Sequence, residues 1–444
     1  MLIKFNLFFF YYIIILFLAA KTLFAKIIVE GSSIPCDIGS GIDLEQKLPQ
    51  WYDEAKFKRG QKYFFDNRFG MMQANYCGLV SLLCDPKGLT ILHNTGRSST
   101  AETARKRYIS TTLHMLSWYE IDLSPGSKSW DSLMRVRKMH LNASKRSQEK
   151  EIGFITQTEV SLTVFGFLGY ALIRPHLLGI RYDNDDDREG FVHFWAVVAA
   201  MLGVHDRFNI CLPKLAVVEM ICKICQRYIF MPLLQIETTL FRSMVQAIVD
   251  GLSEFTPFNS YESLMYFVRR VAGIPGYQHN VDLKKETICR KLFSKEEMTN
   301  MRKVFEGKPG YEYMEQSVID DRILLFNIKQ VNGAIELNQD SLDNNLVSGV
   351  YNKLNDQPIS KNFLIELLGL KHNEELVIEA VENEEDWISN LNDSKLELLS
   401  DKDLRYFKFK CRLMEKNYTR IGNFLNESML SWMLYRMRKA HSSQ

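Results

Sequence analysis

Apolar and polar residues alternate with a helical period over residues 130–147. At about 3.6 residues per turn, one stripe carries Leu133, Val136, Arg137, His140 and Ser144. The remaining polar side chains point elsewhere, among them Arg135, Lys138, Asn142 and Arg146. The pattern therefore predicts a helix with His140 on its buried side.

Helical spacing recurs along the first two thirds of the chain. It predicts helices at residues 69–84, 102–120, 156–172, 188–202, 213–233, 234–252 and 258–272. Within residues 43–67 we expect a helix that breaks near Gly60, and Asp85-Pro-Lys-Gly is expected to end the helix at 69–84. These segments together predict an all-α fold.

Two polar patterns predict helix starts. Thr156 and Glu159 have the spacing of a capping box. The acidic run at residues 183–187 resembles part of a calcium loop but lacks the glycine and the distal glutamate of an EF-hand. We interpret the run as a solvated turn that caps the next helix.

Composition is that of a folded protein with one large or two medium domains. Of the 444 residues, 46% are hydrophobic and 24% are charged, and the net charge is only +2. Basic residues are interleaved with acidic ones throughout, so no nucleic-acid partner is expected. From residue 281 to residue 444 the chain is richer in Lys, Glu, Asn and Asp. This part is expected to be a polar, mainly helical C-terminal region, whose function the sequence does not indicate.

The N-terminus predicts entry into the secretory pathway. Residues 4–20 have a charged start followed by an apolar run of signal-peptide length. Residues 1–25 are expected to be either a cleaved signal peptide or a retained membrane anchor, because Leu23 occupies a position where cleavage favours a small residue. The protein is thus expected in the endoplasmic reticulum lumen or membrane, or outside the cell. Glycans are expected at one or more of Asn392, Asn417 and Asn426, whereas Asn142 is doubtful because it lies within a predicted helix.

Several common chemistries are not indicated. The chain lacks a phosphate-binding P-loop, a dinucleotide fingerprint, His-Glu-x-x-His and Gly-x-Ser-x-Gly. Cys222 and Cys225 form a single Cys-x-x-Cys in a helical rhythm, which favours core packing over a zinc site. His140 remains, with two interpretations: a core histidine bonded to backbone, or an axial ligand of haem iron.

At this point the chain resembles a known family. Arg107-Tyr-Ile-Ser-Thr111 and Val136-Arg-Lys-Met-His140 are similar to the signatures of the rubber oxygenase (latex-clearing protein) catalytic domain family, also called the ER-bound oxygenase mpaB type. Further similar stretches are Arg59-Gly-Gln-x-x-Phe, Leu202-Gly-Val and Ala272-Gly-x-Pro-Gly276. The resemblance covers about residues 45–280.

The resemblance implies a globin-like, multi-helix domain that binds haem b. It implies His140 as the proximal iron ligand, Arg107 and Thr111 as residues of the haem pocket, and Arg137 as a further residue near the haem. The expected activity is cleavage, with dioxygen, of a carbon-carbon double bond in a prenyl or other unsaturated lipid chain. Rubber-cleaving members carry a lysine where this chain has Ser110, which removes a possible distal ligand.

Two alternatives stay open at this point. The chain could be a lumenal haem or lipid binder that does not turn over a substrate. It could also be a helical interaction protein in which His140 is only a core residue.

Overall fold

The computed structural model describes residues 22–37, 48–256, 258–274, 276–277 and 395–442, with positions 16, 19 and 20. Within these residues the regular secondary structure is helical, and the β pairing they contain is an isolated antiparallel bridge between Pro35 and Thr156. The predicted all-α class is therefore confirmed for this part of the chain.

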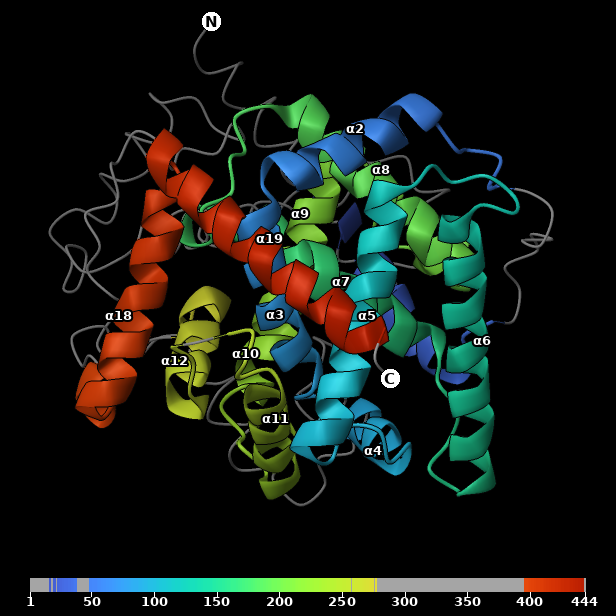
Figure 1. Cartoon of the computed structure of the whole chain (residues 1–444). Helices are drawn as coiled ribbons and strands as arrows, with labels where there is room; N and C mark the ends of the chain where they lie inside the picture. Colours follow the sequence, from blue (N-terminus) through green and yellow to red (C-terminus); the bar gives the residue numbers. More distant parts are fainter. Residues whose placement is uncertain are drawn as a thin grey trace, which may run out of the picture. The chain divides into compact units, whose positions relative to one another are not determined.

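The α-helices follow one another in the order labelled in Figure 1. They are α2 (Glu54–Asp66), α3 (Arg68–Leu82), α4 (Pro86–Asn94), α5 (Ala101–Glu120), α6 (Lys128–Glu149), α7 (Gln157–Ile173), α8 (Asp185–Met201), α9 (Leu215–Cys225), α10 (Met231–Leu233), α11 (Thr239–Gly251), α12 (Tyr261–Ala272), α18 (Asp401–Lys416) and α19 (Arg420–Ser442). A π-helical stretch, Gln226–Phe230, joins α9 to α10.

Glycines let the central helices approach closely. Helix α7 is buried along nearly its whole length and packs against α3, while α2 packs against α8. A Cβ built on Gly78 of α3 would overlap the carbonyl oxygen of Gly166, and one on Gly60 of α2 would overlap that of Gly190. The predicted break near Gly60 was therefore wrong: α2 runs through this residue, which serves the contact with α8 instead.

Helix α4 was missed from the sequence. The Asp85 side chain accepts hydrogen bonds from the backbone N–H groups of Lys87 and Gly88, and Pro86 is the first helical residue. Proline suits this position because no helical partner is needed for its missing N–H. The segment interpreted as a terminator thus also starts a helix.

The predicted capping box is confirmed, and the acidic run does cap the next helix, although that helix begins at Asp185 rather than at Arg188. The backbone N–H of Thr156 donates to Glu159 Oε2 at 2.6 Å, as a capping box requires. Asn184 caps α8, and the acidic run forms the first turn of that helix. Asp187 also accepts a hydrogen bond from Arg59 Nε of α2 at 2.7 Å, so part of the run anchors a neighbouring helix.

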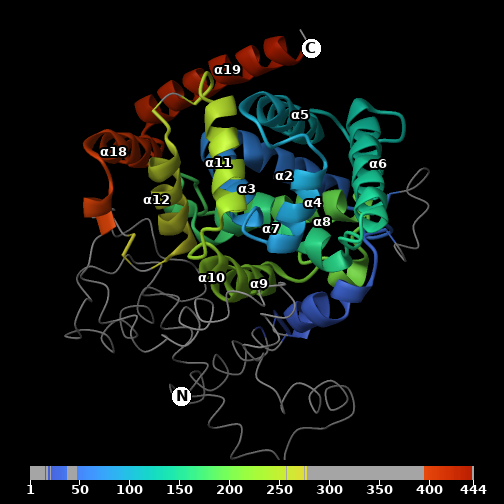
Figure 2. The same ribbon diagram turned by 90° about the horizontal axis from the view of Figure 1, so that it is seen from below.

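The last two helices belong to the same compact unit as the earlier ones. Residues 20–279 and 394–444 cluster together, with α18 against α12 and α19 against α3 and α5 (Figure 2). These helices therefore extend the domain predicted at residues 45–280. The rest of the predicted C-terminal region lies outside the described residues.

Two predicted glycosylation sites are buried. Asn417 donates from Nδ2 to the Gly179 carbonyl, and Asn426 donates from Nδ2 to the Leu413 carbonyl, both at 2.9 Å. Each asparagine is only 3% exposed. A glycan on either amide nitrogen would have no room, so of the three predicted positions only Asn392 remains open to a glycan. The doubted Asn142 is exposed, and Asn392 lies outside the described residues.

Among the described residues, no helix combines the length and apolar character that crossing a membrane requires. Most of the predicted N-terminal apolar run, residues 4–20, lies outside them.

Candidate functional site

The stripe predicted around His140 is present on α6. Leu133 and Ser144 are buried, and the three stripe residues between them are partly buried. The four residues predicted to point elsewhere are all exposed. The stripe faces the neighbouring helices, because α6 packs against α4, α5 and α8. The helix and its orientation were therefore predicted correctly.

His140 has an imidazole nitrogen that is buried without a partner. The residue as a whole keeps part of its surface accessible, but Nδ1 is sealed and accepts or donates no hydrogen bond. Burial and, to a smaller extent, the nearby Arg107 cation together lower the pKa of His140 to about 4. The ring is therefore neutral at pH 7. Leaving such a buried group unsatisfied costs about 1–3 kcal/mol, so a ligand on this nitrogen would be stabilising.

Arg107 on α5 lies close enough to His140 to affect its pKa. Its Nη1 donates to Thr95 Oγ1, at the end of α4, over 3.1 Å. No carboxylate in the described part of the chain pairs with this guanidinium, and burial lowers its pKa, helped by the neighbouring Arg97. His140 of α6 and Arg107 of α5, a cation without a counter-ion among the described residues, thus lie near each other on two helices that pack together.

The other two predicted site residues have different surroundings. Thr111 is exposed, and its hydroxyl donates to the Arg107 carbonyl one turn earlier at 3.0 Å. Arg137 Nε donates to Asp37 Oδ1 at 2.7 Å, and the two side chains form an ion pair. The structure thus brings together His140 and Arg107, whereas Arg137 is held by a carboxylate and Thr111 faces solvent.

A polar cluster fixes how α5 and α6 pair. Ser132 Oγ lies 2.7 Å from His114 Nδ1 and accepts from Trp118 Nε1 at 2.9 Å. Burial lowers the pKa of His114, with Arg135 and His441 adding to the effect. The helical spacing showed that His114 and Trp118 are neighbours of Arg107. It gave no sign of Ser132, Thr95 or Asp37, because their partners lie on other segments.

The histidine site is not part of a larger metal-ligating cluster. Over the described ranges, no three His, Cys, Asp or Glu side chains gather in a way that would hold a metal ion. Cys222 and Cys225 are buried in α9, in agreement with core packing. A cofactor here would depend on a single protein ligand.

Comparison with models of protein families, with curated proteins and with solved structures found no match. The resemblance to the rubber oxygenase family therefore stands on the short motifs around Arg107 and His140.

Acid is expected to destabilise the folded chain through His140. Its folded pKa of about 4 lies below the ordinary value of 6.5, so the unfolded chain binds the proton more readily. The contribution of the neutral imidazole to the free energy of unfolding is fully present above pH 6.5 and is lost as the pH falls toward 4. The free energy of unfolding should therefore fall by about 2 kcal/mol between pH 7 and pH 5. Urea unfolding of the parent and of His140→Gln at both pH values measures it.

The effect of His140 is the difference between the parent and His140→Gln in how much free energy of unfolding each loses from pH 7 to pH 5. Burial raises the pKa of Asp85 to about 6, and this shift works in the opposite direction over the same range. Asp85 is present in both proteins, so its contribution cancels. Equal loss of stability in parent and variant would contradict a neutral, buried His140.

Proposed function

We propose that this chain is a haem b-dependent oxygenase that cleaves a carbon-carbon double bond of a prenyl or other unsaturated lipid chain with dioxygen. The observation that carries the proposal is the buried, unpartnered Nδ1 of His140 beside Arg107, which lacks an anionic partner. The motif resemblance supports it independently. A globin-like arrangement of the helices and a place in the secretory pathway are parts of the same proposal.

The residues present fit a haem in their chemistry. A neutral imidazole is the form that ligates iron, and burial keeps His140 in that form. Arg107 offers donors for a propionate through charge-assisted hydrogen bonds. Bound haem b supplies the redox-active iron for reaction with dioxygen. Arg137 would lie near the haem without binding it directly, because Asp37 already holds its guanidinium.

A haem or lipid binder without turnover is the second candidate. Thr111 uses its hydroxyl within α5, and Ser110 stands where the rubber-cleaving pattern has a lysine. Both observations leave Arg107 as the one predicted pocket residue with donors available for a ligand. Substrate cleavage assays separate this candidate from the oxygenase.

Removing Arg107 is expected to damage the haem environment without unfolding the domain. A lost hydrogen bond from a charged group costs about 1.5–3 kcal/mol, so Arg107→Ala should weaken haem or oxygen affinity by about ten- to hundredfold. Thr111→Val should have a smaller effect, because it keeps the shape and removes a hydroxyl that bonds within its own helix. The measurements are the Soret band after haem addition, oxygen binding to the reduced protein, and oxidative cleavage of a farnesyl compound.

Arg135→Ala is the matched control, because Arg135 is an exposed arginine on α6. It should match the parent in all three assays. If Arg107→Ala also matched the parent, Arg107 would not belong to the pocket. A parent that gains a Soret band but cleaves no lipid would support the binder, and a parent with no Soret band would leave a helical interaction protein.

A further inference from the structure

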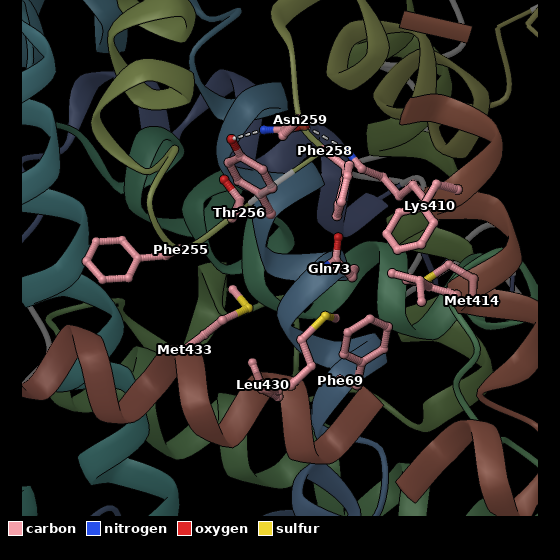
Figure 3. Close-up of a pocket in the computed structure, with 14 residues that line it drawn as sticks. Phe69, Gln73, Phe255, Thr256, Phe258, Asn259, Lys410, Met414, Leu430 and Met433 are labelled. Carbon is pink, nitrogen blue, oxygen red and sulfur yellow. Dashed lines mark hydrogen bonds between the residues drawn. The ribbon is translucent and has the colours of Figure 1, made fainter. Parts of the chain in front are cut away.

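A second site lies away from His140, between α3, α18, α19 and the segment that joins α11 to α12 (Figure 3). The cavity has a volume of about 70 Å³. Its walls are mainly apolar and contain several methionines, among them Met414 and Met433. None of its lining residues belongs to the candidate haem site.

Lys410 of α18 places an amine in this apolar pocket. The residue is 9% exposed, and its Nζ donates to Asn259 Oδ1 at 2.9 Å. Asn259 in turn donates to the hydroxyl of Tyr76 at 3.2 Å (Figure 3). The centre of the Phe267 ring lies 5.3 Å from the amine. No carboxylate of the described residues forms an ion pair with Lys410.

Packing alone does not account for this lysine. Burial lowers its pKa to about 8, so at pH 7 the group still carries its charge most of the time. A buried charge without a counter-ion is costly even when it is hydrogen-bonded, and a methionine or leucine of similar size would fill the same place at lower cost. An anion beside the ammonium group would offset this cost.

We propose that this pocket binds a small amphiphile with an anionic head, carboxylate or phosphate, and an apolar chain. The head lies at Lys410 Nζ, and the chain lies along Phe69, Leu430 and Met433 (Figure 3). Methionine side chains adapt to chains of different shape, which suits a site for flexible hydrocarbon. The proposal does not depend on haem, because the two sites share no residue.

Calorimetry on the full chain tests the proposal with three ligands that share one chain: octanoate, octyl phosphate and the neutral 1-octanol. The parent should bind at least one anion, and that anion should bind at least tenfold more tightly than octanol. Loss of a charged hydrogen bond predicts at least a tenfold weaker anion affinity in Lys410→Met, with octanol unchanged. Whichever anion binds more tightly identifies the head group.

Two further variants separate the effect of the Lys410 charge from general effects of substitution in this part of the protein. Lys402→Met removes an exposed lysine of the same helix and should bind the anions like the parent. Met433→Trp fills the apolar part while keeping Lys410, and should weaken all three ligands. The proposal is overturned if neither anion binds the parent, if octanol binds as tightly as the anions, or if Lys410→Met retains full anion affinity.

Octanoate affinity should also fall as the pH rises above about 8, because Lys410 then loses its proton. The titratable groups facing the amine are Tyr76 and Cys77 on α3 and Cys411 on α18. Burial raises the pKa of Cys77 to about 12 and raises that of Tyr76 well above its ordinary value, so both stay neutral over this range. The pH dependence should be absent from Lys410→Met.

Discussion

Replacing His140 with alanine is expected to abolish haem retention while the helical circular dichroism signal persists. Under the proposed function the imidazole would be the protein ligand of the iron, and the described residues offer no metal-binding cluster to replace it, so its loss should remove the bond rather than weaken it. The fold should tolerate the change, because His140 makes no hydrogen bond in the described structure and its Nδ1 is an unsatisfied buried group. The measurement is Soret absorbance per chain after gel filtration.

His114→Ala is the matched control, because it removes another partly buried histidine from the neighbouring helix. His114 is bonded to Ser132, so this variant should lose stability but keep its haem. Added imidazole should restore a Soret band to His140→Ala by entering the space of the missing ring. Equal haem occupancy in His140→Ala and the parent would rule out His140 as an essential ligand, and the residue would then be a core histidine.

The features predicted correctly from sequence are those that depend on near neighbours along the chain. The stripe around His140 follows from the helical period, and the Thr156 capping box follows from two residues three positions apart. The turn before α8 follows from the capping preference of Asn and Asp. Each is settled within one or two helical turns, so a single sequence suffices.

The features that were wrong or missed depend on distant segments. Nothing near Arg137 indicates that Asp37 would hold its guanidinium, and nothing near Asn417 indicates that α18 packs so as to bury it. Lys410 reads as a solvated lysine on an amphipathic helix until α3 and the α11–α12 segment close around it. Gly60 was predicted to break a helix because its reason for being glycine, the close approach of α2 to Gly190 of α8, cannot be seen in the local sequence.

The same reasoning predicts a large effect at the crossing of α3 and α7. In an isolated helix, replacing glycine with alanine is stabilising by about 1 kcal/mol. At Gly78 the new methyl group would overlap the backbone carbonyl of Gly166, which cannot move aside as a side chain can. Overpacking in a core typically costs about 1–3 kcal/mol or more, and here the two helices must separate. Gly78→Ala is therefore expected to destabilise the domain by about 3 kcal/mol, opposite in sign to helix propensity.

Urea unfolding followed by circular dichroism measures this change, and Gly126→Ala serves as its control. Gly126 has a φ of +80°, and a Cβ there would meet no other atom within 4 Å. Its replacement reports the backbone strain alone, which is about 1–2 kcal/mol for a residue with a side chain in that conformation. A Gly78→Ala protein as stable as the parent, or more stable, would mean that α3 and α7 do not cross at backbone contact. Helix α3 also lines the pocket around Lys410, so a separation of α3 from α7 should weaken octanoate binding as well as lower the stability. Gly126→Ala should leave octanoate binding unchanged.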